Sequence, residues 1–289
     1  MRLKHYQEKV ITTLKNYLSA LSEYKSKYEK FLEIEPDMAS DYDFPKRAFI
    51  QTTNRNIYHN KTNGLNKPLP DVYFKVPTGG GKTLLACHSI DLIHKSYLKK
   101  QTGLVLWIVP STQIYRQTIL ALKNREHPYR QILDISSGGR TLIKEKTEMF
   151  NRLDVKENLV VLMLMLPSAN RLNRDTLKVF RDAGGFNDFF PAEDNYPAQE
   201  ELLKLIPNLD CFGDDGEVFQ RQIKTSLGNT LKVLKPLVII DEGHRAYGEQ
   251  ARNTVRNFNP SFILELSQHH RQTAMSWYAL REGNYTRRK

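Results

Sequence analysis

Two stretches of the sequence carry residues whose types and spacing suit phosphate chemistry. The first, "VYFKVPTGGGKTLLA" at residues 72–86, runs from an apolar segment through three glycines into a helical pattern. Backbone N–H groups converge on a phosphate only where side chains are absent, and a helix N-terminus adds a favourable dipole. We therefore predict a nucleotide-phosphate loop, with cofactor-binding residues Thr78, Gly79, Gly80, Gly81, Lys82 and Thr83.

Two side chains of this loop have separate tasks. Lys82 would reach the β- and γ-phosphates of a nucleotide, and the hydroxyl of Thr83 would ligate Mg²⁺. The strict loop pattern has glycine where Val76 stands, so the match is incomplete. The alternative is a glycine-rich turn without a ligand, which the strand before it and the helix after it disfavour.

The second stretch is "KPLVIIDEGHRAYG" at residues 235–248, an apolar strand that ends in an acidic pair. The ends of such strands face the crevice in which α/β sheets bind ligands. Asp241 would hold Mg²⁺, and Glu242 would orient and deprotonate the attacking water. His244 could then sense the γ-phosphate. An acidic pair after a strand is often only structural, but the phosphate loop in the same chain favours catalysis.

Short apolar runs alternate with helical patterns from Asp71 onward. The runs are apolar on both faces, as in parallel strands that helices cover on both sides. We therefore predict an α/β fold with a mostly parallel sheet, preceded by N-terminal helices at 3–34 and from Pro45 to Tyr58. The expected strands are 72–76, 104–109, 131–136, 158–166, 236–241 and 262–267, and the expected helices between them are 82–99, 111–124 and 248–257.

One segment, residues 182–217, departs from this alternation because it is acidic and rich in glycine, proline and phenylalanine. We interpret it as a long loop inserted into the domain. A solvated surface excursion would explain it, as would a role in masking a DNA channel or contacting a partner subunit.

The composition favours a soluble protein with a polyanionic partner. The formal net charge is +11, although five basic residues and one acidic residue beyond Ser267 contribute +4 of it. No apolar run approaches the ~20 residues that span a bilayer, and the first ten residues lack a signal-peptide core. The two cysteines, Cys87 and Cys211, lack metal-ligand spacing and are expected to be buried thiols. We predict a cytoplasmic protein that binds no membrane.

The two motifs at this separation resemble the first RecA-like domain of superfamily-2 helicases, in the DEAH-like branch. The flanking sequences, "LWIVPSTQIYRQT" and "SLGNTLKVLKPLVIIDEGHRAYG", are similar to those of the restriction (Res) subunits of type III restriction endonucleases. The likeness covers most of residues 1–267. It implies a RecA-like P-loop NTPase domain that uses ATP and Mg²⁺ to move on double-stranded DNA, together with a modification (methyltransferase) subunit.

The resemblance gives a role to weaker motifs. In "LKHYQEKV", Gln7 would make two hydrogen bonds to adenine, although it could equally be an ordinary helix-surface residue. Pro110, Ser111 and Arg116 follow the second strand, where helicases contact the DNA backbone, and Ser111 could instead be a plain helix cap. The segment "LMLPSANR" places Ser168 and Arg171 after a later strand in the same way, but lacks the family's usual threonine.

In these helicases the strand that ends at Ser267 continues Ser-Ala-Thr, and here it continues "QHHRQ". If the Ser267 codon is TCG and reading restarts at its last base, synonymous codons for the next residues decode as Ala-Thr-Pro-Pro. We hypothesise that one nucleotide was lost at this codon and that residues 268–289 are translated out of frame. The alternative is a genuine basic tail that binds nucleic acid.

The expected organisation follows from these readings. Residues 1–60 would be a helical region with the adenine-reading element, 71–267 the first RecA-like domain and 268–289 an out-of-frame tail. The family's second motor lobe and nuclease would then be missing, and activity would be residual. Other functions stay open: a single-lobe nucleic-acid-binding fragment without catalysis, another superfamily-2 helicase outside restriction, or, less favoured, a small-molecule phosphotransferase.

Overall fold

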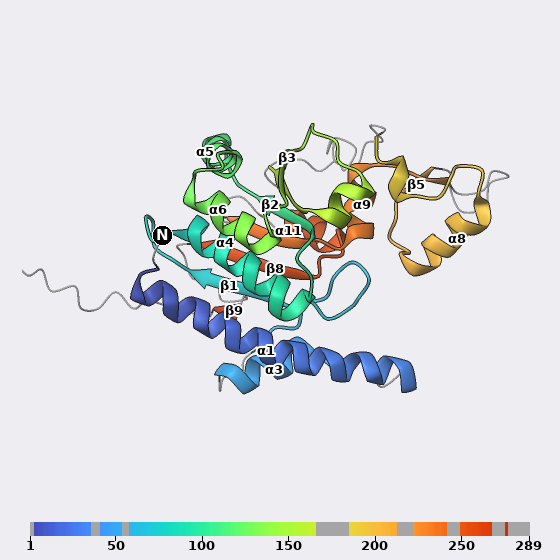
Figure 1. Cartoon of the computed structure of the whole chain (residues 1–289). Helices are drawn as coiled ribbons and strands as arrows, with labels where there is room; N and C mark the ends of the chain where they lie inside the picture. The colour runs from blue at the N-terminus through green and yellow to red at the C-terminus, as the bar shows by residue number, and fades with distance from the viewer. Residues whose placement is uncertain are drawn as a thin grey trace, which may run out of the picture.

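The computed structural model describes residues 3–35, 41–53, 58–165, 185–212, 222–241, 249–267 and 275–276 (Figure 1). Within them, a seven-stranded sheet has the order β3-β4-β2-β7-β8-β1-β9, and every neighbouring pair is parallel. The strands are β1 (Asp71–Lys75), β2 (Gly103–Ile108), β3 (Thr141–Glu145), β4 (Leu159–Leu164), β7 (Leu237–Asp241), β8 (Phe262–Ser267) and β9 (Met275–Ser276). The predicted parallel α/β sheet is confirmed.

Two apolar layers cover the two faces of this sheet. Alternate residues of each strand point to opposite sides, so Val72 and Leu264 join one cluster while Ile263 and Val238 join the other. The helices on the first face are α1 (His5–Ile34), α3 (Phe44–Thr53), α4 (Lys82–Ile93), the π-helix η1 (His94–Leu98), α5 (Thr112–Lys123) and α6 (Pro128–Ser137). The second face is covered by α7 (Arg152–Glu157), α9 (Leu227–Leu234), α11 (Glu249–Asn257) and the inserted segment.

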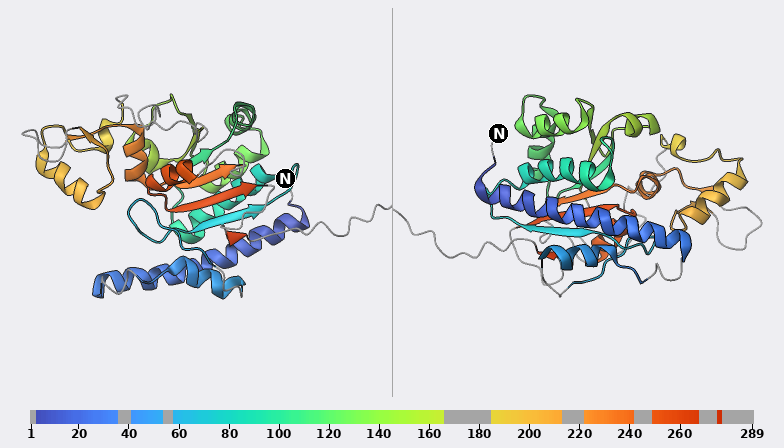
Figure 2. Two further views of the ribbon diagram at one scale, coloured as in Figure 1. Left: turned by 180° about the vertical axis from the view of Figure 1, so that it is seen from behind. Right: turned by 60° about the horizontal axis from the view of Figure 1, so that its bottom comes forward.

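The helical pattern predicted at 3–34 forms one continuous helix, α1. Figure 2 shows α1 running along the β1 side of the sheet, with α3 packed against it. Leu14, Tyr17 and Leu21 are spaced at helical intervals and fully buried. The N-terminal helices are therefore part of the main core, and they bring the first turn of α1 next to the glycine-rich loop.

The prediction of a strand at 131–136 is wrong, because these residues lie in α6. His127 caps the start of α6, Pro128 occupies its first turn, and Gly138 ends it with φ 64°. These start and stop signals outweigh the strand propensity of the two isoleucines. The sequence analysis also missed the five-residue strand β3, at the far edge of the sheet, where Lys144 and Glu145 are half-buried and break the apolar pattern.

The interpretation of the acidic insertion as a loop is also corrected. Its described residues form η4 (Asn187–Phe189), α8 (Tyr196–Leu205) and strand β5 (Cys211–Phe212), which pairs antiparallel with β6 (Gln222–Ile223). The ring of Phe186 meets that of Phe150 at 5.3 Å between centroids, so the segment has its own buried contact with the domain. Its cysteine, Cys211, is half-buried rather than buried, whereas Cys87 is buried as expected.

Candidate nucleotide-binding site

The glycine-rich loop has the predicted strand–loop–helix setting. Strand β1 ends at Lys75, and α4 begins at Lys82 after Gly81, whose φ of 79° lies in the left-handed region. The N–H of Gly80 donates to the carbonyl of Pro77 at 3.0 Å, which closes the turn. Lys82 and Thr83 therefore occupy the first turn of α4, where free backbone N–H groups and the helix dipole favour an anion.

The loop has no room for side chains where it is tightly packed. A Cβ on Gly80 would lie 2.7 Å from Cγ1 of Val76, and one on Gly81 would lie 2.6 Å from Nε2 of Gln7. At Gly79, with φ 72°, nothing lies within 4 Å of the Cβ position. The loop is thus braced on its inner side and open at Gly79, the geometry that a phosphate cradle requires.

The first turn of α1 makes hydrogen bonds to this loop. The Tyr6 hydroxyl and the Nε2 of Gln7 both donate to the carbonyl of Gly80, at 2.5 and 2.9 Å. The Oε1 of Gln7 accepts the N–H of Lys4 at 2.8 Å, and the side chain is buried. Gln7 is therefore not an ordinary surface residue. The sequence analysis missed Tyr6, whose only signal was its place beside Gln7.

Strands β7 and β8 end on the same side of the sheet as β1, where the carboxyl ends of the parallel strands lie. Asp241 is the last residue of β7 and is 5% exposed, and Ser267 is the last residue of β8. The N–H of Val76 donates to the carbonyl of Ser267 at 2.8 Å, so the entry to the phosphate loop is joined to the end of β8. Because β8 separates β7 from β1, Asp241 lies two strand spacings, about 10 Å, from β1. Glu242 and His244 lie outside the described residues.

The donor set suits Mg²⁺ bound together with phosphates. In the described part of the chain, no three His, Cys, Asp or Glu side chains gather as a metal site. Mg²⁺ commonly takes one or two protein oxygens and completes its shell with water and substrate phosphates. Thr83 beside the loop and Asp241 at the same edge of the sheet fit that requirement, with the space over Gly79 for the phosphates.

The residues predicted to contact DNA lie only in part within the described chain. Pro110 follows β2, Ser111 caps α5 and Arg116 is exposed on α5. Ser111 Oγ accepts the N–H of Ile114 at 3.3 Å, so its capping role is confirmed, while its hydroxyl proton can still be donated to a phosphate. Ser168 and Arg171 are outside the described residues.

On the same face of β8 as Ser267, two residues earlier in the strand, Glu265 belongs to a group of buried charges. Burial and then the nearby Asp71 carboxylate raise the pKa of Glu265 to about 7, against the opposing effect of the Arg252, Lys61 and Arg256 charges. Lys61 forms a 2.9 Å ion pair with Asp71, whose carboxylate is also buried. The strand that carries Ser267 thus runs beside buried charged groups of β1 and the segment before it.

The parallel sheet and the braced loop at the carboxyl end of β1 define a RecA-like P-loop domain. The sequence matches the family "Type III restriction enzyme, res subunit" over residues 1–268. The chain therefore belongs to this family, and the matched region is the N-terminal, helicase-like ATP-binding motor domain of superfamily 2. No curated protein matches the sequence. None of the described helices is both long and apolar enough to cross a bilayer.

Proposed function

We propose that this chain is an ATP- and Mg²⁺-dependent motor domain that acts on double-stranded DNA within a restriction system. The observation that carries the proposal is the phosphate loop, open at Gly79 and braced at Gly80 by Tyr6 and Gln7. Such a loop in front of a helix N-terminus binds the phosphates of a nucleotide. Membership of the family supports ATP as that nucleotide.

The residues of the site take separate roles in this proposal. Backbone N–H groups of Gly79, Gly81 and Lys82 bind the phosphates, with Thr78 at the loop entry, while Gly80, whose N–H donates to Pro77, keeps the turn closed. The ammonium of Lys82 neutralises charge on the β- and γ-phosphates, and Thr83 with Asp241 holds Mg²⁺. When bound, the ion supplies neutralisation of charge on the phosphate oxygens. Glu242 positions the attacking water, and His244 responds to the γ-phosphate.

Gln7 has a role in the geometry of the loop. Its side-chain amide already donates to Gly80 and accepts from Lys4, so it positions the loop in the described conformation. A bidentate bond to adenine uses the same two atoms, Oε1 and Nε2. We infer that Gln7 acts first as a positioning residue, and that base reading by Gln7 would require these bonds to be exchanged.

We propose that DNA contacts the side of the sheet where the strands end, beside the nucleotide loop. Pro110, Ser111 and Arg116 follow β2, next to β7 in the sheet, and the exposed Arg116 suits a phosphate. Ser168 and Arg171 are proposed for the same task. A modification subunit, as the family implies, would supply sequence recognition, and the cytoplasm is the proposed location.

The proposal is tested by measuring ATP hydrolysis with and without double-stranded DNA. For the 289-residue polypeptide we expect ATP binding with slow turnover, because the opposing cation that the family's second lobe supplies is worth about 10³–10⁵ in rate. For a protein with the frame restored after Ser267, we expect DNA to stimulate hydrolysis, and Arg116→Ala to reduce the stimulation. Hydrolysis that DNA never stimulates would contradict the translocase assignment and favour a nucleotide-binding fragment.

A change of reading frame after Ser267 is a separate proposal. The family match ends at residue 268, and the sequence departs from the family's Ser-Ala-Thr at the same point. The two-residue β9 beside β1 does not decide the matter, because an edge strand offers unpaired backbone groups to any segment. Sequencing the gene across the Ser267 codon tests it: a continuous helicase frame shifted by one base supports the proposal, and its absence refutes it.

A further inference from the structure

The amino ends of the parallel strands lie on the side of the sheet opposite the nucleotide loop. Lysines from three connecting segments lie on this side. They are Lys67 before β1, Lys99 and Lys100 between η1 and β2, and Lys235 before β7. The strand register sets Leu237, two residues after Lys235, beside Val105, two residues after Gly103. A Cβ on Gly103 would meet Nζ of Lys100 at 3.1 Å, which places that ammonium at the start of β2. We call these four residues the basic edge.

The lysines of the basic edge are not neutralised by the described acidic residues. No ion pair joins any of the four to an Asp or Glu in that part of the chain, whereas Lys61 nearby is paired with Asp71. Burial lowers the pKa of Lys235, and the charge of Lys67 lowers it further. Burial and the charge of Lys25 do the same for Lys100. Lys67 therefore repels Lys235, and Lys25 repels Lys100, at a cost that a bound anion would relieve.

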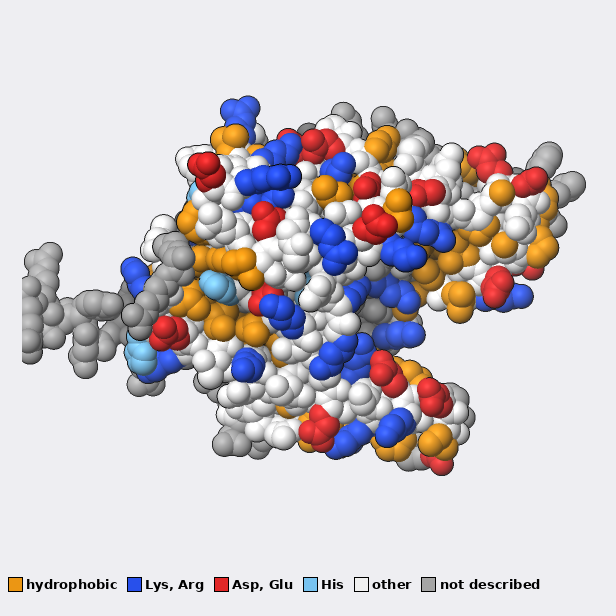
Figure 3. Space-filling view, viewed as in Figure 1, with side chains coloured by type: hydrophobic (Ala, Val, Ile, Leu, Met, Phe, Trp, Pro, Cys, Tyr) orange, Lys and Arg blue, Asp and Glu red, His pale blue; other side chains and the backbone are white. Residues whose placement is uncertain are grey.

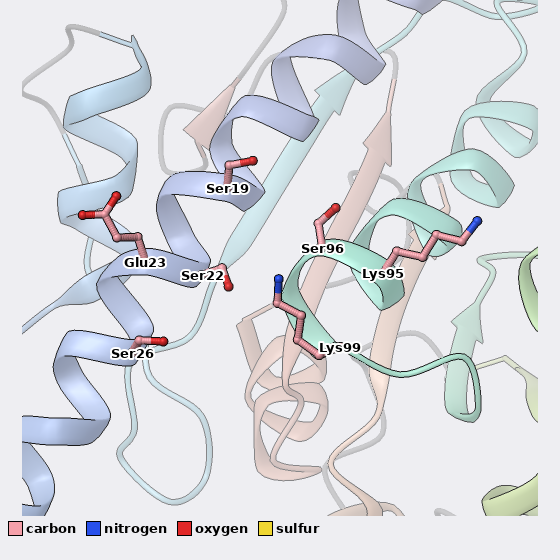
Figure 4. A pocket seen from close by; sticks show the side chains of 7 residues that line it. All are labelled: Ser19, Ser22, Glu23, Ser26, Lys95, Ser96 and Lys99. Atoms are coloured by element: carbon pink, nitrogen blue, oxygen red, sulfur yellow. The ribbon is translucent and has the colours of Figure 1, made fainter.

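A polar groove adjoins the basic edge between α1 and η1 (Figure 4). It has a volume of about 460 Å³ and is lined by Ser19, Ser22, Glu23, Ser26, Lys95, Ser96 and Lys99. In Figure 4 the ammonium of Lys99 points across the groove toward α1, while the carboxylate of Glu23 points away. Glu23 instead accepts a 2.6 Å bond from Lys27, and Lys95 is paired with Asp91 at 2.7 Å. The groove thus presents hydroxyl groups and one uncompensated ammonium.

The chemistry of this surface favours a phosphate backbone over a protein partner. Every lining side chain of the groove is polar, whereas protein interfaces are centred on buried aromatic or aliphatic anchors. Lysine and serine are common donors to nucleic-acid phosphates. From β2 to β1 the sheet order spans three strand spacings, about 14 Å, which corresponds to about four nucleotides along one strand. Figure 3 shows Lys and Arg side chains gathered on this face.

We propose that the basic edge and the α1–η1 groove form a second nucleic-acid contact, which binds the phosphate backbone of DNA on the side of the sheet away from the nucleotide loop. This contact is separate from the one proposed at Ser111 and Arg116. Because none of its residues touches the phosphate loop, it would hold DNA whether or not ATP is bound. The motor domain would therefore remain bound to DNA throughout the cycle of ATP binding and hydrolysis.

The test measures binding of the 289-residue protein to a fluorescein-labelled 30-base-pair duplex by anisotropy, from 50 to 200 mM salt without nucleotide. Variants K67A/K235A and K99A/K100A each lose two charges of the basic edge. The control K46A/K204A removes two exposed lysines, from α3 and α8, so its net charge is the same. K67R/K235R keeps the charge and reports any damage to the fold.

We expect both basic-edge variants to bind the duplex about tenfold more weakly, and the slope of log affinity against log salt to fall by about 1.8, while the control and K67R/K235R keep their affinity. Equal losses in all the alanine variants would overturn the proposal, because net charge alone would then explain binding. So would unchanged duplex binding with lost binding of polyglutamate, which would identify an acidic protein as the partner. ATP binding, measured on the same variants, stays unchanged; its loss in Lys82→Ala tests the proposed function separately.

Discussion

The side-chain amide of Gln7 donates a 2.9 Å hydrogen bond to the carbonyl of Gly80, which joins the first turn of α1 to the phosphate loop. The same amide accepts the N–H of Lys4 and so also fixes the start of the helix. A Cβ on Gly81 would clash with this amide at 2.6 Å. Helix and loop therefore form one unit, and changes at the N-terminus should affect nucleotide binding.

Replacing Gln7 by alanine should weaken the binding of ATP and GTP alike. Loss of the bond to Gly80 removes about 1 kcal/mol of support from the loop, which corresponds to about a fivefold loss of affinity. Fluorescent derivatives of both nucleotides measure this, with the exposed Gln51→Ala on α3 as control. A loss confined to ATP would instead identify Gln7 as a base-reading residue.

Asp241→Asn should reduce only the part of nucleotide affinity that depends on Mg²⁺. The neutral amide keeps the shape of the buried side chain but is a poor ligand for a hard cation. Titrations with ATP in the presence of Mg²⁺ and of a chelator separate the two parts. The control is Asp194→Asn, an exposed residue of the insertion. Equal weakening with and without Mg²⁺ would contradict the assignment of Asp241.

Glu265→Gln should make the protein more stable relative to the wild type as pH rises. Burial and Asp71 raise the pKa of Glu265 from 4.5 to about 7, so between these values the folded state binds a proton that the unfolded state does not. The stabilising contribution is present below the ordinary value and is lost as pH rises through the folded pKa.

Urea unfolding at pH 5.5 and pH 8 measures the effect. From pH 5.5 to pH 8, the free energy of unfolding of the variant should rise relative to that of the wild type by up to about 2 kcal/mol, at 1.36 kcal/mol per pH unit. The control is Glu201→Gln, an exposed residue of α8. A constant difference between variant and wild type at both pH values would show that Glu265 does not titrate in this range.

Asp210→Ala should destabilise the attachment of the insertion to the domain. The buried ammonium of Lys232 donates to Asp210 at 2.7 Å and to the carbonyl of Asn208 at 2.6 Å. Loss of a bond to a charged group costs about 2 kcal/mol, whereas the exposed Glu200→Ala should change little. Chemical unfolding followed by circular dichroism measures both variants. If they are equally stable, the ion pair is not a significant anchor.

The sequence predicted the parts of the fold whose patterns are local. Fully buried strands such as β2 and β4 show as continuous apolar runs, and the phosphate loop is marked by its glycines before Lys82. Strand β3 could not be found in this way, because an edge strand with Lys144 and Glu145 has no such run. At 131–136 a strand was predicted where the structure has a helix, because six residues of an amphipathic helix that contain two isoleucines have the composition of a strand.

The candidate site was predictable only where its residues are contiguous in sequence. Tyr6 contacts Gly80 across 74 positions, and nothing near Tyr6 marks that contact. The same holds for the bond from Val76 to Ser267, which depends on β8 lying beside β1. Strand order is set by long-range packing, so these links required the three-dimensional structure.

Nucleotide binding by the phosphate loop is the central claim, and a titration of the 289-residue protein with a fluorescent ATP analogue in the presence of Mg²⁺ tests it most directly. We expect saturable binding to the wild type, a loss of at least tenfold in affinity for Lys82→Ala, and no change for the exposed Lys46→Ala on α3. Wild-type protein that does not bind the analogue, or Lys82→Ala protein that binds it equally well, would contradict the account.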